Sequence, residues 1–228
     1  MAEPTGRVEA FSDGVFAIAI TLLILEIRVP HEDIASLGRL WAALAALWPS
    51  YLALLLSFFV ILVMWVNHHE LLRLVREVDY PFLFANGLLL LMVTFMPFPT
   101  AVLAQFLATD AARAAAAFYC GTFVLNSLAW GLLFATIVRR RLLRPEVDAE
   151  TVARIRRAYT FGPLVYVVST AVAFAHAGAG LALNTSLWIV WLRLCYHPTH
   201  EVKHEGTTAR RYNGTARSGI GVAPSQEG

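Results

Sequence analysis

The sequence predicts an all-α membrane protein with six transmembrane helices. Hydrophobic residues make up 58% of the 228 residues and charged residues only 15%, whereas soluble domains carry about 25% charged residues. Several apolar runs approach the roughly 20 residues that a helix needs to cross a bilayer. The two cysteines, Cys120 and Cys195, lie in apolar runs without metal-ligand spacing. We therefore expect neither a disulfide framework nor a cofactor.

The first apolar segment predicts a helix from about residue 8 to residue 29, which Pro30 ends. Acidic residues interrupt its start and no cleavage site follows, so we expect the segment to stay in the mature protein rather than to act as a cleaved signal peptide. Its first two turns carry Arg7, Glu9, Ser12 and Asp13. A charge near the bilayer costs a few kcal/mol, so these residues indicate a function or a polar partner.

The second and third helices are predicted at about residues 40–72 and 81–107. Pro49 is expected to bend the second helix. Pro97 and Pro99 are expected to kink or break the far end of the third, because proline cannot donate the helical hydrogen bond.

A fourth helix is predicted at about residues 111–138, and its alanine-rich start suits close helix packing. Residues 142–157 read as a basic, partly amphipathic connector. Helices at about 158–176 and 181–196 follow, with a tight loop expected at the glycine-rich residues 178–180.

The distribution of basic residues predicts the orientation. Six crossings put both termini on one side, and that side holds nearly all the arginines and lysines. By the positive-inside rule it is cytoplasmic. We therefore expect a membrane domain over residues 1–197, a disordered cytoplasmic tail over 198–228 that is too polar to bury a core, and a multi-pass location in a bacterial plasma membrane. The cytoplasmic set comprises Arg7, Arg73, Arg76, Arg139, Arg140, Arg141, Arg144, Arg154, Arg156, Arg157, Arg193, Lys203, Arg210, Arg211 and Arg217, and the opposite set comprises Arg28, Arg39 and Arg113.

Two polar clusters are predicted to meet at the cytoplasmic face, where the first helix begins and the second ends. Arg7 or His69 could pair with Asp13. Trp65 lies four residues before His69 and shares its helix face. The expected network is completed by the hydrogen bonds of Ser12 and Asn67.

Neighbouring His68 is interpreted as an interfacial anchor at headgroup level. Adjacent histidines point to different faces of one helix, so we expect no fixed metal site at residues 67–70.

The first helix also carries an apolar stripe. Ile18, Leu22 and Leu25 recur at helical spacing, with Thr21 beside them. Most such stripes are packing faces, and the spacing alone does not distinguish a packing face from a functional one.

The pattern Arg7-x-x-x-Phe11-Ser12-Asp13, with the apolar run through Glu26 and with Trp65 and His69, resembles the signature of the transmembrane protein 175 family. The members of this family are endolysosomal and bacterial potassium channels. The resemblance covers about residues 5–198, and one repeat per chain is the bacterial pattern.

The resemblance implies a homotetramer in which four copies of the first helix line a central pore. Ile18 corresponds to the family's constriction, Leu22 and Leu25 to further apolar layers, and Thr21 to a hydroxyl layer. Potassium would pass transiently near Ile18 and Thr21. By the same resemblance, a structural motif that ties the first helix to its surroundings comprises Arg7, Phe11, Ser12 and Asp13, with Trp65 and His69 beside it. Asn67 belongs to the expected network by its position between Trp65 and His69.

The implied function is passive, potassium-selective conduction rather than enzymatic catalysis. The expected partners are further copies of the chain and membrane lipids, with no nucleic acid. Two alternatives stay open. One is a proton-coupled secondary transporter with Asp13 or His69 as the titrating group, and the other is a non-conducting scaffold whose basic connector binds anionic lipid.

Overall fold

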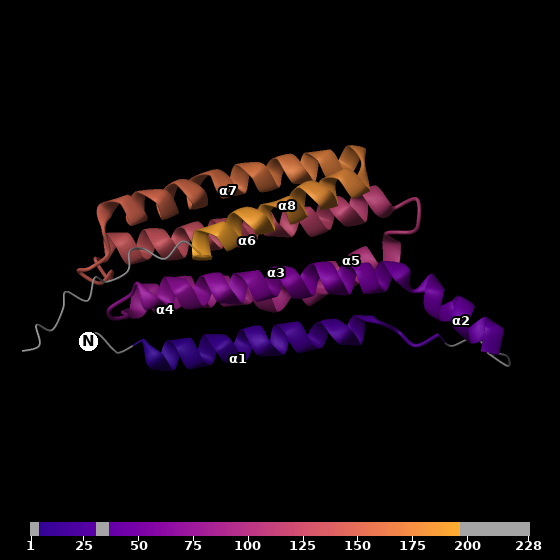
Figure 1. The fold of residues 1–228 in the computed structure, drawn as a ribbon, viewed down its shortest axis with the longest axis horizontal. Coiled ribbons are helices and arrows are strands. Elements are labelled where there is room, and N and C mark those ends of the chain that lie inside the picture. The colour runs from indigo at the N-terminus through magenta and orange to yellow at the C-terminus, as the bar shows by residue number, and fades with distance from the viewer. Residues whose placement is uncertain (1–4, 31–36, 197–228) are drawn as a thin grey trace, which may run out of the picture. The chain divides into compact units, whose positions relative to one another are not determined.

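The computed structural model describes residues 5–30 and 37–196, and within these ranges the regular secondary structure is helical, with one isolated β-bridge (Figure 1). The expected tail and the loop after the first helix lie largely outside the described residues. The elements in order are α1 (Gly6–Leu22), the 3₁₀-helix η1 (Leu23–Glu26), α2 (Leu37–Ala46), α3 (Trp48–Arg73), α4 (Tyr80–Phe95), α5 (Pro97–Phe106), α6 (Ala112–Arg139), α7 (Ala149–Ala175) and α8 (Ala177–Tyr196).

Prolines divide the predicted second and third helices. The second is interrupted at Leu47, two residues before Pro49, and the third at Met96, directly before Pro97. In each case the proline lies in the first turn of the following helix, where its missing N–H costs least.

A chain of buried hydroxyls crosses the break between α4 and α5. Thr100 Oγ1 donates to the Met96 carbonyl at 2.8 Å, Ser57 Oγ lies 2.6 Å from Thr100 Oγ1, and Tyr119 Oη lies 3.1 Å from Ser57 Oγ. Each hydroxyl has one hydrogen, so Ser57 must donate to Thr100 and Tyr119 to Ser57. The break is thereby joined to α3 and α6.

The last two helices begin earlier than predicted. The connector expected at 142–157 is helical from Ala149, because the Asp148 carboxylate caps the helix by accepting from the Thr151 amide at 2.7 Å. The loop expected at 178–180 is also wrong. The chain turns at His176, which has extended backbone angles, and the glycines lie inside α8. A Cβ on Gly180 would lie 2.4 Å from the Ala173 Cβ, so glycine there permits close packing of α7 and α8.

The C-terminus of α6 ends in a Schellman motif. Arg141 has a φ of 58°, the Leu142 amide donates to the Ile137 carbonyl at 3.0 Å, and the Arg141 amide donates to the Val138 carbonyl. Leu142 and Ile137 are both buried and supply the apolar contact that accompanies this motif.

The connectors that follow α3 and α6 are bonded to each other. The Arg76 amide donates to the Leu142 carbonyl at 2.8 Å, and the Arg144 amide donates to the Leu74 carbonyl at 2.9 Å. Asp79, the N-cap of α4, accepts from Arg140 Nε at 2.7 Å.

Helix α1 packs against α3 and α4, while α6, α7 and α8 pack against one another (Figure 1). Within the part of the chain that the structure describes, five stretches are long and apolar enough to cross a membrane: Gly6–Glu26, Trp48–Arg73, Tyr80–Phe106, Ala112–Arg139 and Ala149–Ala175. Helix α8 occupies the position of the predicted sixth crossing but is not among these five.

Candidate functional site: the polar end and the exposed stripe of helix α1

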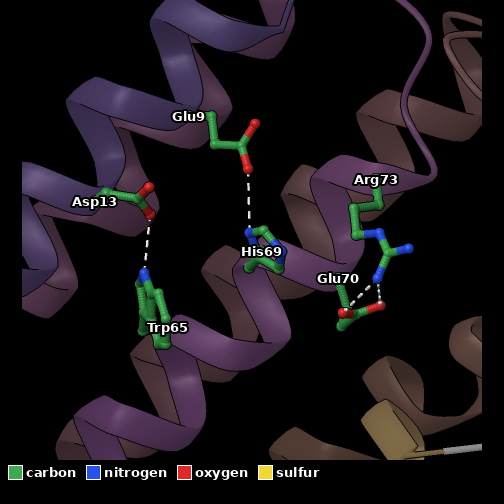
Figure 2. A network of polar contacts seen from close by, with 6 residues as sticks. All are labelled: Glu9, Asp13, Trp65, His69, Glu70 and Arg73. Atoms are coloured by element: carbon green, nitrogen blue, oxygen red, sulfur yellow. Dashed lines mark hydrogen bonds and ion pairs between the residues drawn. The ribbon is translucent and has the colours of Figure 1, made fainter.

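Two parallel polar contacts join α1 to α3 (Figure 2). Glu9 Oε1 lies 3.1 Å from His69 Nδ1, and Asp13 Oδ1 accepts from Trp65 Nε1 at 2.8 Å. The two helices are antiparallel, so a step of four residues along α1 matches a step of four back along α3. The rings of Trp65 and His69 stack at 6.2 Å. The contacts therefore fix the register of α1 against α3.

A second, fully buried set of contacts ties α1 to α4. Ser12 Oγ accepts from Asn86 Nδ2 at 3.1 Å, and Asn86 Oδ1 lies 2.8 Å from His68 Nε2. Ser12 and His68 are fully buried, and Asn86 is 3% exposed. Asn86 is thus the one side chain that contacts both α1 and α3 in this set.

The amide of Asn86 determines that Nε2 of His68 carries a hydrogen. The amide oxygen can only accept, so the hydrogen of this bond is on Nε2 of the histidine. Nδ1 is buried and has no hydrogen-bond partner among the described residues. The imidazole packs between the rings of Phe16, at 5.4 Å, and Trp130, at 6.1 Å. His68 is therefore a buried connector and not the interfacial anchor that the sequence suggested.

Three expected partners differ from the observed ones. His69 pairs with Glu9 rather than with Asp13, because the antiparallel register brings Trp65 opposite Asp13. Arg7 is exposed and forms no ion pair with a described residue, because it lies on the outward side of α1. Asn67 donates to the Val63 carbonyl on its own helix at 2.7 Å.

Asn67 also lines a cavity of about 30 Å³ among α3, α6, α7 and α8, which has room for about one water molecule. Five aromatic side chains of the cavity wall come from the last three helices: Trp130, Tyr159, Tyr166, Trp188 and Trp191.

The outward side of α1 and η1 is apolar and exposed. Ile18 is 60% exposed, Leu22 38% and Leu25 70%, and Phe11, at 66%, lies on the same side. Exposed positions recur at alternating intervals of four and three residues, the spacing by which helices of a coiled coil face one another. These positions are Arg7, Phe11, Gly14, Ile18, Thr21 and Leu25.

Thr21 presents its hydroxyl oxygen as an acceptor on this exposed side. Its Oγ1 donates to the Ile18 carbonyl at 2.9 Å. The single hydroxyl hydrogen is used in that bond, and the lone pairs remain available to a partner outside the helix.

The sequence indicated a polar partner for Glu9 but did not predict which one, and Asn86 was missed. Glu9 precedes Asp13 by four residues, the same spacing as between Trp65 and His69, and that match was the available signal. Asn86 is an isolated amide in an otherwise apolar helix, which by itself indicates a buried polar partner. Within residues 5–30 and 37–196 there is no cluster of three or more histidine, cysteine or acidic side chains arranged to hold a metal ion.

A potassium channel of Chamaesiphon minutus is 51% identical over 171 residues, which cover 75% of this chain and 84% of the relative. The family model described as endosomal/lysosomal potassium channel TMEM175 matches residues 7–97. The chain belongs to the TMEM175 family. The resemblance identified from the motif of the first helix is thereby confirmed.

The fold agrees with that assignment. The crystal structure of a lysosomal potassium-selective channel TMEM175 homologue from Chamaesiphon minutus superposes with a TM-score of 0.75 at 45% identity, covering 84% of this chain and 98% of that one. The human endosomal/lysosomal proton channel TMEM175 is 43% identical over 97 residues, which cover 40% of this chain and 19% of the human protein. The chain is thus a membrane protein of an ion-channel family and not an enzyme.

Proposed function

We propose that the chain is a potassium-selective cation channel that conducts passively through a central pore of a homotetramer. The observation that carries the proposal is the exposed stripe of α1. One side of this helix is held by Glu9, Ser12 and Asp13, while the other leaves Ile18, Leu22 and Leu25 without cover in a single chain. The potassium channels among the family members support the choice of ion.

The geometry supports a hydrophobic constriction. Four copies of Ile18 would form a narrow apolar ring, with Leu22 and Leu25 as further layers, and such a ring gates by dewetting. An ion that sheds water at lower cost passes more readily, which favours potassium over sodium. The outward lone pairs of Thr21 would hold a partly hydrated potassium ion one turn beyond Ile18. The permeant ion is the only ligand that the proposal requires, and it includes no cofactor or fixed metal.

Association between copies of the chain, which the proposed tetramer requires, is supported by two grooves beside α1. One, of about 380 Å³, lies between α1 and α4 and is lined by Arg7, Phe11 and Leu83 among others. The other, of about 510 Å³, lies between the far end of α1 and α5, near Leu22 and Phe98. Side chains of a neighbouring copy would fill both grooves.

The proposed orientation has six crossings, with α8 as the sixth, and both termini in the cytoplasm of a bacterial cell. The ends of α3 and α6 and the start of α7, with the connectors between them, carry most of the arginines of the described residues, which supports this orientation by the positive-inside rule.

Flux into liposomes that contain the purified protein tests the function. Potassium flux well above sodium flux, unchanged by a proton ionophore, is expected. The Ile18→Asn variant should conduct severalfold more and select less, because a polar ring removes the dewetting barrier. Ile24→Asn is the matched control, since Ile24 is 56% exposed but is not one of the exposed positions that recur at intervals of four and three residues. If Ile18→Asn conducts and selects like the parent, Ile18 is not the constriction.

Proton permeation is the second candidate, favoured by the name of the human relative. Flux that is carried by protons in the absence of potassium would support it, and flux that requires a proton gradient would support the carrier alternative, with Asp13 or His69 as the group to replace next.

A further inference from the structure

A groove of about 370 Å³ lies between α6 and α7, apart from the exposed stripe of α1. The two helices lie side by side (Figure 1). One end of the groove is basic and the rest is mainly apolar. It is lined by Gly131, Phe134, Ala135, Val138 and Arg139 of α6 and by Arg156, Tyr159 and Thr160 of α7.

The basic end lies where the membrane-spanning stretch of α6 ends, at Arg139. Arg156 stands one turn before Thr160 on α7, and a short connector brings the start of α7 to the same end. Arg139 and Arg156 are exposed and form no ion pair with a described residue, whereas Arg73 and Arg140 each do. The groove therefore presents two uncompensated guanidinium groups at the membrane boundary.

The apolar part continues from there toward the membrane interior. Gly131 lies eight residues before Arg139, about 12 Å deeper along the helix. A Cβ on Gly131 would lie 3.7 Å from the Tyr159 carbonyl oxygen, an ordinary contact distance, so α6 and α7 approach closely at the deep end of the groove. The sequence of charge and then apolar surface along one groove matches a phosphate group followed by an acyl chain.

We propose that this groove binds an anionic phospholipid, with its phosphate at Arg139 and Arg156 and an acyl chain along Ala135 and Gly131. Guanidinium groups bind phosphate oxygens through two parallel hydrogen bonds. Basic pockets between transmembrane helices are known to take such headgroups. The proposal goes beyond potassium conduction and holds whichever ion passes the pore.

Native mass spectrometry of the full chain, purified and supplied with equal amounts of phosphatidylglycerol and phosphatidylcholine, tests this site. The parent should retain phosphatidylglycerol preferentially. The double variant Arg139→Gln/Arg156→Gln should bind it about thirtyfold more weakly, a factor equivalent to about 2 kcal/mol for two basic groups. Arg154→Gln/Arg157→Gln is the matched control, because it removes the same charge from exposed positions that do not line the groove.

The variant Arg139→Lys/Arg156→Lys should retain less phosphatidylglycerol than the parent but more than the glutamine variant, because lysine keeps the charge but cannot form the two parallel hydrogen bonds. Inorganic phosphate should not displace the lipid, since phosphate lacks the acyl chain. Equal losses in the two glutamine double variants would overturn the proposal in favour of diffuse attraction by the whole basic face. Displacement by inorganic phosphate would overturn it in favour of a simple anion site. Each variant is first compared with the parent by size-exclusion elution, and the lysine variant gives the answer if the glutamine variant does not assemble.

Discussion

Replacing Asn86 by leucine should loosen α4 from both α1 and α3. The leucine matches the amide in size but removes the bonds to Ser12 and His68. Hydrogen bonds between membrane helices contribute about 0.6 kcal/mol on average and up to about 1.7 kcal/mol. Two bonds therefore predict a loss of about 1–3 kcal/mol in the free energy of unfolding. The upper part of that range is expected because both former partners are fully buried and each loses the hydrogen bond to Asn86.

A double-mutant cycle isolates the bond from the change in packing. The free energy of unfolding is measured in mixed micelles, at one protein concentration, for Ser12→Ala, Asn86→Leu and the double variant. Because the two residues share a hydrogen bond, the double variant should lose less than the sum of the two single losses. The expected difference is roughly 0.6–1.7 kcal/mol.

Ser169→Ala provides the matched control, since Ser169 is also fully buried but donates to the Tyr166 carbonyl of its own helix. It should combine additively with Asn86→Leu. Additive losses for Ser12 and Asn86 would refute the reasoning, because they would mean that the amide contributes only packing.

Two further predictions concern the connectors and α8. Partial burial opposes ionisation of the Asp79 carboxyl, but hydrogen bonds from Arg140 and from the backbone outweigh this effect and lower the pKa of Asp79. The ionised carboxylate therefore stabilises the folded protein above the unfolded-state pKa near 4, and this stabilisation is lost as the pH falls from there through the lower folded-state pKa. Asp79→Asn keeps the helix cap but removes the charge. The Tm of this variant should lie below that of the parent at pH 7, by an amount equivalent to about 0.2–1 kcal/mol, and the two Tm values should converge below about pH 4. A difference in Tm that persists at low pH would contradict the ionic role. Gly180→Ala should cost about 1–3 kcal/mol, because its Cβ would overlap Ala173, while the exposed Gly178→Ala should be nearly neutral, and equal Tm values for the two would argue against close packing.

The sequence predicted those features that single residues determine. Pro49 and Pro97 lack the N–H that would continue the preceding helix, so an interruption near each was foreseeable, although Pro163 lies inside α7 without dividing it. The glycines at residues 178–180 were wrongly predicted to form a loop, because glycine suits a turn and a close helix contact equally well. Only the packing of Gly180 on Ala173 distinguishes the two.

The sequence predicted that polar side chains of the first two crossings meet, but not which residues pair. The sequence places polar side chains at the same end of two helices, but it does not give their relative rotation and register. Asp13 therefore had several possible partners before the structure placed Trp65 beside it. Asn86 belongs to a third helix whose distance from Ser12 follows from tertiary packing alone.

The hydroxyl chain at the break between α4 and α5 has a mechanical consequence. A proline-interrupted helix normally supplies a hinge, because the missing hydrogen bonds leave the bend soft. Here Ser57 of α3 and Tyr119 of α6 connect the bend to two neighbouring helices, so changing the bend angle would break a series of buried hydrogen bonds. The bend between α4 and α5 should therefore be rigid. Among the described residues, the hydrogen bonds and ion pairs between α1 side chains and other helices lie at its polar end, whereas Ala19 and Leu23 are held by apolar packing alone. Tilting of α1 would therefore widen a passage between copies at lower cost than bending at this break.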